Sequence, residues 1–357
     1  MPTTTVPDAQ REISLLRLVA QGVVGRRETP REVVARLTAV QAQDEAGAQL
    51  SIALRAGVPR SAVVAEYDAG TVVRSWTQRG TLHAVLAEDL PWMAELMNVR
   101  PMAAQAKRRP QLDLDASHVA RANDATVAAL RGGGRLARAE LMAAWADAGL
   151  ETSGGRGYHL LSTLGHAGLV CFGPTRDGEQ LIVLVEEWVP APRTPTREEA
   201  LRELALRYFL GHGPATVPDL VRWTGLTAKD ARAGLALALD KLATLEVDGV
   251  TYYLDRTIPA LLEKHRAAAE ATLLLPGFDE MVLGYADRTA TVPAPYADLI
   301  VPGRNGVFRH TVVDRGVVVG AWRAVGSGRN RRVEVEAFED LTPAVTEAVP
   351  ALFAALP

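Results

Sequence analysis

The alternation of apolar and polar positions predicts a repeated order of elements, in which helices are followed by a short pair of strands. The clearest copy spans residues 196–256, where three amphipathic segments precede the strand pair Leu245–Leu254. Thr216 and Thr227 stand where helix N-caps are predicted, and Asp248-Gly249 is a strong signal for a tight hairpin turn. Three helices followed by a β-hairpin are typical of a winged helix-turn-helix module.

The same order recurs upstream, which indicates that one supersecondary unit repeats along the chain. A second module is predicted over residues 116–192, and its strand pair is joined by a turn at residues 175–178. A first, more irregular module is predicted over residues 1–115. Its elements are helices near 10–20, 30–40, 44–56 and 60–70 and strands at 72–76 and 80–85.

Short apolar runs replace the helical pattern after Glu270, so residues 257–357 are predicted to form a β-rich C-terminal region. The predicted strands are 273–275, 281–283, 307–313, 317–323 and 332–337. The predicted fold class is therefore α+β, with three tandem winged helix-turn-helix modules forming a concave scaffold and a C-terminal β-rich segment.

Composition narrows the setting of the protein. The 357 residues are 48% hydrophobic, and neither a membrane-spanning apolar run nor a signal-peptide pattern appears. Cys171 is the only cysteine and lies in an apolar run, which favours a buried strand residue over a nucleophile. No metal-ligand spacing or phosphate-binding loop is present, so we expect no cofactor, no metal and no membrane partner. A cytoplasmic location and a monomeric state are the corresponding expectations.

The distribution of charge says more than its sum. A net charge of −3 does not favour nucleic acid as a partner, but residues 302–332 contain seven arginines and His310, opposed only by Asp314. A second basic cluster is Lys107-Arg108-Arg109. Each cluster fits either a solvated charged surface or a contact with phosphates.

The most informative short motif is Gln41-Ala-Gln43, which follows a predicted amphipathic helix closing near Val40. Residues i and i+2 of an extended segment point to the same side, so both carboxamides are expected to face one pocket. A carboxamide cannot abstract a proton, but it can hold and orient a water molecule. The alternatives are solvent-facing glutamines at a helix end, and a catalytic base at the neighbouring Asp44, which should face away or cap the next helix.

Three further segments resemble one known family. They are Ser75-Trp-Thr-Gln-Arg-Gly-Thr-Leu-His83, Leu275-Pro-Gly-Phe-Asp-Glu-Met-Val-Leu-Gly-Tyr-Ala-Asp-Arg288 and Val318-Val-Gly-Ala-Trp-Arg323. Together with the first motif they resemble the tandem winged-helix family of the bacterial DNA glycosylases AlkZ and YcaQ (also called AlkX). The resemblance covers residues 13–338 in the family's order. The family carries Q-x-Q or Q-x-D near its N-terminus, and this chain resembles the Q-x-Q, AlkZ-like branch.

The resemblance implies a monofunctional DNA glycosylase that acts on double-stranded DNA with bulky N7-alkylguanine adducts or interstrand crosslinks. It also implies self-resistance to a DNA-alkylating natural product. Alkylation at N7 makes the base a cationic leaving group, so no general acid is needed, unlike ordinary glycoside hydrolysis. Gln41 and Gln43 are the expected catalytic pair, positioning the water and stabilising the oxocarbenium-like sugar. The expected DNA contacts are Arg79, Thr81, His83, Lys107, Arg108, Arg304, Arg309, His310, Arg323 and Arg329.

Several alternatives stay open at this point. His83 is equally well explained as a buried histidine, and Asp279 and Arg288 are expected to have structural roles in ion pairing and packing. A transcriptional regulator is a competing function, because winged helices often read DNA sequence. The predicted helix 227–239 nevertheless carries Asp230 beside Lys229 and is largely apolar, which favours a scaffold helix. A non-catalytic protein that binds lesions is the third possibility.

Overall fold

The computed structural model describes residues 6–304 and 306–357, and its chain forms two compact units. Unit 1 comprises the chain up to Arg60 together with Leu201–Trp223 and Thr227–Pro357, and unit 2 comprises Ser61–Ala200 and Thr224–Leu226. Each unit is described by itself. The border between the two units follows Arg60, inside the first module predicted over residues 1–115. The division of the chain into three modules therefore stays a prediction.

A sheet in which two hairpins meet lies at the centre of unit 2. Antiparallel strands β2 and β3 form one hairpin, β4 and β5 form the other, and β2 pairs with β4. Both hairpins turn through residues of positive φ, Arg79-Gly80 and Asp177-Gly178, as expected for tight turns that match the strand twist. The strands are β2 Val72–Gln78, β3 Thr81–Leu86, β4 Val170–Arg176 and β5 Glu179–Leu184.

Helices pack on this sheet around a core of large side chains. Trp76, Trp145 and Leu160 are almost fully buried in one apolar cluster. Helix α9 approaches β2 so closely that a Cβ at Gly165 would lie 2.1 Å from the Trp76 ring. The helices of this part of the chain are α4 Arg60–Asp68, α5 Leu90–Met97, α6 Val99–Arg108, α7 Ala116–Leu130, α8 Arg138–Asp147, α9 Arg156–His166 and α10 Val185–Trp188.

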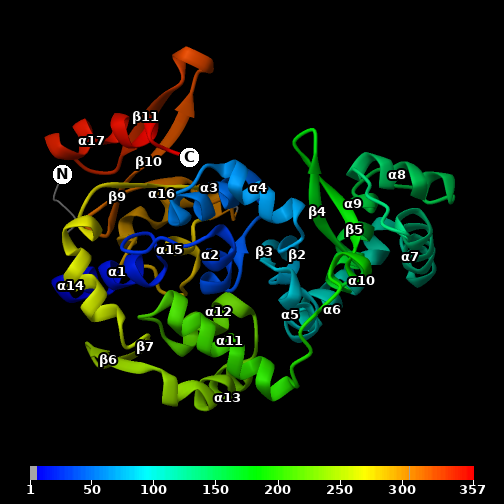
Figure 1. Ribbon diagram of the computed structural model, residues 1–357, viewed down its shortest axis with the longest axis horizontal. Coiled ribbons are helices and arrows are strands. Elements are labelled where there is room, and N and C mark those ends of the chain that lie inside the picture. Colours follow the sequence, from blue (N-terminus) through cyan, green and yellow to red (C-terminus); the bar gives the residue numbers. More distant parts are fainter. Residues whose placement is uncertain (1–5, 305) are drawn as a thin grey trace. The chain divides into compact units, whose positions relative to one another are not determined.

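The element order predicted for residues 196–256 is confirmed. Helices α11 Arg197–His212, α12 Val217–Thr224 and α13 Ala228–Ala238 precede the antiparallel hairpin β6 Ala243–Val247 and β7 Val250–Leu254 (Figure 1). Thr216 and Asp219 form a reciprocal cap, and the Thr227 side chain accepts from the Asp230 N–H. The local cap and turn signals therefore located these elements correctly.

The remaining part of unit 1 combines N-terminal and C-terminal segments. Leu15 and Leu18 of α1 pack in one core cluster with Ile258 and Leu262 of α14. A second sheet has the strand order β11-β10-β9-β8, with α17 packed against it. The elements are α1 Asp8–Ala20, α2 Pro30–Leu37, β1 Val40–Gln41, α3 Glu45–Ala56, α14 Ile258–Ala269, β8 Leu273–Leu275, α15 Glu280–Leu283, α16 Ala297–Ile300, β9 His310–Asp314, β10 Val317–Val325, β11 Arg332–Ala337 and α17 Pro343–Ala354.

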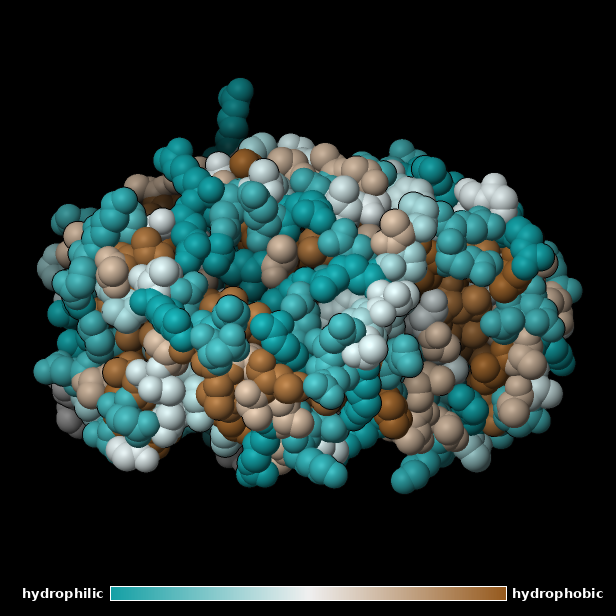
Figure 2. All heavy atoms as spheres, turned by 60° about the horizontal axis from the view of Figure 1, so that its bottom comes forward, coloured by the Kyte–Doolittle hydropathy of each residue, from teal (hydrophilic) through white to brown (hydrophobic). Residues whose placement is uncertain are grey.

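Some predictions from the sequence were wrong. The strand predicted at residues 281–283 is helix α15, because the Asp279 side chain accepts the Met281 N–H and so caps a helical turn. Helices α5, α6, α14 and α17 were missed, so the C-terminal region is less purely β than predicted. On the face shown in Figure 2, hydrophilic residues predominate and apolar residues appear as scattered patches.

Candidate active site

The segment that carries the two glutamines begins with a strained turn. Helix α2 has a capping box at its start, formed by Thr29 and Glu32, and ends at Leu37. Thr38 then adopts φ 66° and ψ −45°, and the Ala39 N–H donates to the Leu37 carbonyl over 2.7 Å. This is a γ-turn, and a positive φ is unfavourable for a β-branched residue. The helix thus ends before the predicted Val40, and the chain enters Gln41 extended.

Gln41 and Gln43 occupy different environments. Gln41 is 5% exposed, whereas Gln43 is exposed. The Gln41 side chain reaches forward along the chain, and its Oε1 accepts the Gln43 N–H over 3.0 Å. The two residues are therefore joined by a hydrogen bond, with one carboxamide held in the protein and the other at the surface. Their shared orientation toward one pocket stays a prediction.

The buried carboxylate of Glu280 anchors this segment. Its Oε1 accepts the Gln41 N–H over 3.1 Å, and its Oε2 accepts Trp223 Nε1–H over 2.9 Å. His212 Nε2 lies 3.4 Å from the same Oε2. Glu280 and His212 are 0% exposed, and His212 stacks on Tyr208 at 4.7 Å between ring centroids. Glu280 thereby joins the glutamine segment to the aromatic core around helices α11 and α12.

Asp279, the residue before Glu280, is held by a second buried network. Arg55 donates to both of its oxygens over 2.8 and 2.9 Å, and Ser51 Oγ donates over 2.7 Å. Burial alone would raise the pKa of Asp279, but the Arg55 charge and these hydrogen bonds hold that pKa below its ordinary value. The predicted structural role of Asp279 is confirmed. Arg288 is also structural, donating to the Val282 carbonyl and lying over the Phe308 ring.

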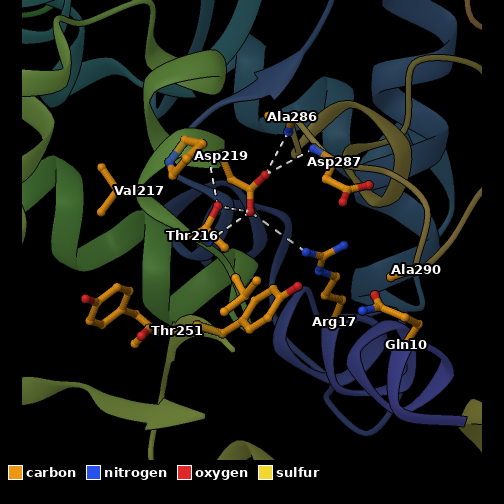
Figure 3. A pocket seen from close by; sticks show the side chains of 13 residues that line it. Gln10, Arg17, Thr216, Val217, Asp219, Thr251, Ala286, Asp287 and Ala290 are labelled. Atoms are coloured by element: carbon orange, nitrogen blue, oxygen red, sulfur yellow. Dashed lines mark hydrogen bonds and ion pairs between the residues drawn. The ribbon is translucent and has the colours of Figure 1, made fainter. Parts of the chain in front are cut away.

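A third buried carboxylate, Asp219, lies in the first turn of helix α12 (Figure 3). It accepts from Thr216 and from the Ala286 N–H, and Arg17 Nη2 lies 3.9 Å away. The Arg17 guanidinium also covers the Tyr285 ring at 3.5 Å. Burial raises the pKa of Tyr285. Asp219, Arg17, Thr216 and Ala286 border a cavity of about 350 Å³, whose other lining residues include Gln10, Val217, Thr251, Asp287 and Ala290.

Asp44 and His310 both lie near Gly277. A Cβ built on Gly47 would lie 2.7 Å from Asp44 Oδ2 and 3.2 Å from the Gly277 carbonyl, and one built on Gly277 would lie 3.6 Å from His310 Nδ1. Asp44 occupies the N-cap position of α3 without a side-chain cap bond. Burial lowers the pKa of His310, which the Asp44 charge raises and the Arg60 charge lowers. The structure therefore brings His310 closer to the glutamine segment than their separation along the chain suggests.

The predicted DNA contacts of unit 2 form two groups. Arg79 Nη2 donates to His83 Nε2 over 3.3 Å, and His83 Nδ1 donates to the Thr81 carbonyl over 3.0 Å. His83 is 0% exposed, so the buried-histidine alternative describes its position, and its ring holds Arg79. Lys107 and Arg108 are exposed at the end of α6, a helix with no buried residue.

The arginines of the C-terminal sheet are less isolated than the sequence indicated. Arg323 of β10 pairs at 2.7 Å with Glu334, which faces it on the neighbouring strand β11. Arg309, which directly precedes β9, pairs at 2.5 Å with Glu336 of β11. Arg329 is exposed, and the Arg304 side chain lies outside the described residues. Asp314 is therefore not the only acidic residue beside these arginines, because Glu334 and Glu336 also pair with two of them.

Sequence reasoning missed Glu280, which holds the glutamine segment, and its two further partners Trp223 and His212. The available signal was a carboxylate inside the apolar run 280–283, where an unpaired charge would be costly. Its partners lie 239, 57 and 68 positions away along the chain, so no local pattern could identify them.

Within residues 6–304 and 306–357, no group of three or more His, Cys, Asp or Glu side chains is arranged to hold a metal ion. Cys171 is buried in β4, as predicted, and burial raises the pKa of its thiol. None of the described helices is long and apolar enough to span a membrane.

Comparisons with known proteins agree with these features. The family model "DNA glycosylase AlkZ-like" matches residues 34–356. An interstrand DNA cross-link repair glycosylase of Streptomyces sahachiroi is 28% identical over 318 residues, which cover 82% of this chain and 82% of the relative. The structure of the Streptomyces sahachiroi DNA glycosylase AlkZ has the same fold, with a TM-score of 0.79, 23% identity and coverage of 98% of this chain and 96% of that one. The chain belongs to the AlkZ-like family of DNA glycosylases.

Proposed function

We propose that this DNA glycosylase hydrolyses the N-glycosidic bond of bulky N7-alkylguanines in double-stranded DNA, including interstrand crosslinks, and that it serves self-resistance to a DNA-alkylating natural product. Gln41 and Gln43 are the proposed catalytic pair. Support comes from the Gln41-Ala-Gln43 motif and from a relative whose name is interstrand DNA cross-link repair glycosylase.

The chemistry of the lesion suits a carboxamide pair. An N7-alkylated guanine carries a positive charge and leaves as a neutral base, so the enzyme need not protonate it. The remaining tasks are to hold a water molecule near C1′ and to tolerate positive charge on the sugar. Oriented dipoles meet both needs when they are fixed before the reaction begins.

The observation that carries the proposal is the hydrogen bond from the Gln43 N–H to Gln41 Oε1, together with the anchoring of the Gln41 N–H by Glu280. A carboxamide oxygen has two lone pairs, so Gln41 Oε1 retains acceptor capacity for a water molecule. Gln43 is exposed and extends toward solvent from a fixed backbone. One glutamine would thus hold the water while the other contacts the lesion strand.

The proposed DNA contacts combine exposed cations with arginines held by weak ion pairs. Lys107, Arg108 and Arg329 are exposed and suited to phosphates. Arg323 pairs with Glu334 at the surface, and exposed pairs of this kind contribute only about 0–1 kcal/mol. A phosphate can therefore replace the glutamate at little cost. Arg79, Arg309 and His310 remain proposed contacts, with Arg79 held by the buried His83.

Release of free base tests this proposal directly. Duplexes carrying a single N7-methylguanine, and duplexes treated with a nitrogen mustard to give bulky N7 adducts and crosslinks, are incubated with the protein in EDTA. The proposal predicts metal-independent release of the alkylated guanine, faster from bulky adducts, with an abasic site left in the strand. Binding without release would instead identify a protein that only sequesters lesions.

A further inference from the structure

The Glu280 carboxylate is buried against donors from two distant parts of the chain. One oxygen accepts the Gln41 backbone N–H, and the other accepts the Trp223 indole N–H. Glu280 itself is 0% exposed. A buried carboxylate without such partners would be strongly unfavourable. The pairing with Gln41 therefore contributes to keeping the carboxylate inside the protein, and it ties the glutamine segment to the core.

The backbone that carries Glu280 is itself immobilised. Glu280 is the first residue of α15, and the N-cap residue Asp279 is held by Arg55 and Ser51. The Gln41 N–H therefore donates to a carboxylate whose backbone is held in place by the neighbouring Arg55–Asp279 ion pair. By contrast, the turn before Gln41 stores strain at Thr38. A strained segment keeps one conformation only when surrounding contacts determine it.

We propose that Glu280 is a positioning residue of the excision site. Its carboxylate fixes the Gln41 backbone, so that Gln41 Oε1 can accept the Gln43 N–H and both carboxamides are held ready for the water and the sugar. This inference rests on the proposed function of the two glutamines. Glu280 acts through Gln41 and has no contact with the substrate.

The side chain at position 280 must accept two hydrogen bonds on different atoms, one from the Gln41 N–H and one from the Trp223 indole N–H. A carboxylate only accepts, whereas a carboxamide has one oxygen and one NH₂ group. In Glu280→Gln, the NH₂ group must face either the Gln41 N–H or the Trp223 N–H. Trp223→Phe removes the competing indole donor. His212 Nε2, 3.4 Å from the same end of the side chain, can accept from the NH₂ group in the tautomer protonated at Nδ1, so in the double variant the glutamine oxygen can accept the Gln41 N–H again.

This logic gives a double-variant experiment. Wild type, Glu280→Gln, Trp223→Phe and the double variant are compared in single-turnover base release from mustard-treated duplex DNA, with Kd for the same DNA measured in parallel. Small misplacements of reacting groups cost about tenfold to a hundredfold in rate. We expect a loss of that size in Glu280→Gln with little change in Kd, and partial recovery of the rate in the double variant.

Amide hydrogen exchange of residues 39–45 supplies a readout that does not depend on catalysis. Exchange should accelerate in Glu280→Gln and slow again in the double variant. Asp219→Asn is the matched control, because Asp219 is an equally buried carboxylate that does not contact the glutamine segment. It should lower stability while leaving exchange at residues 39–45 unchanged.

The outcomes separate the two proposals. If Glu280→Gln keeps both the wild-type rate of base release and the wild-type amide exchange, the positioning role is overturned. It is also overturned if the double variant loses as much rate as the two single variants together. A wild type that releases no base would overturn the proposed function, while the exchange comparison would still decide whether Glu280 fixes Gln41. If Glu280→Gln alone does not fold, the double variant is compared with Trp223→Phe, and restored folding with wild-type exchange supports the role.

Discussion

Arg55 and Asp279 form a two-point ion pair in the interior of unit 1, with Nη1–Oδ2 at 2.8 Å and Nη2–Oδ1 at 2.9 Å. Both side chains are 1% exposed. The pair is completed by Ser51, and Arg55 Nη2 also donates to Gln21 Oε1 over 2.9 Å. The residue that follows Asp279 is Glu280, so this ion pair fixes the start of the helix that anchors Gln41.

Removing one charge of this pair should be costly. Breaking a buried ion pair by changing one partner typically destabilises a protein by about 3–5 kcal/mol. We therefore expect Asp279→Asn to lower the free energy of unfolding by roughly that amount in urea denaturation. Arg323→Gln is the control, because its pair with Glu334 is exposed and should contribute no more than about 1 kcal/mol. Equal losses in the two variants would contradict this account.

The same carboxyl group makes stability depend on pH. The pKa of Asp279 is lowered in the folded protein, so its contribution is fully present above the unfolded-state value of about 3.9. That contribution is lost as the pH falls through the folded-state pKa. Denaturation curves from pH 7 to pH 3 should show a constant difference between wild type and Asp279→Asn down to about pH 4, and a narrowing difference below it. A difference that narrows near neutral pH would be inconsistent with this assignment.

The γ-turn at Thr38 should be a site of stored strain. Glycine adopts positive φ at little cost, whereas an unfavourable backbone conformation costs on the order of 1–3 kcal/mol. Thr38→Gly should relieve this strain, but part of the stability gained is offset by the greater conformational freedom of glycine in the unfolded chain. We expect Thr38→Gly to raise the free energy of unfolding by about 1 kcal/mol. Thr38→Ala keeps the strain and serves as the comparison, and a Thr38→Gly variant less stable than Thr38→Ala would show that the turn is unstrained.

Salt dependence tests the basic end of α6. Each phosphate contact by a cation adds about 0.9 to the slope of log K against log salt concentration for duplex DNA. Replacing Lys107 and Arg108 with glutamine should therefore reduce that slope by about 2 units if both cations contact phosphates. Lys229→Gln is the control, since Lys229 is exposed on the scaffold helix α13. A slope that falls only in Lys229→Gln would instead favour DNA contact by helix α13.

Local signals accounted for most of the elements but not for the contacts of the site. Thr216, Thr227 and Asp248-Gly249 act through neighbouring backbone, so the helices and the hairpin of residues 196–256 could be predicted to within a few residues. The run 281–283 is too short for its period to separate helix from strand, and the deciding cap came from Asp279. Gln41 and Gln43 stood out by spacing, whereas Glu280 depends on partners that only the tertiary structure brings together.

Gln41 and Gln43 are the proposed catalytic pair, which positions the water and stabilises the sugar as the glycosidic bond is hydrolysed. The most direct measurement is the single-turnover rate of N7-alkylguanine release for wild type, Gln41→Ala and Gln43→Ala, at protein concentrations that saturate binding. We expect a rate loss of about a hundredfold or more in each variant, comparable to removing one preorganised catalytic dipole, with Kd nearly unchanged. Wild-type rates in both variants, at equal occupancy of the DNA, would contradict it.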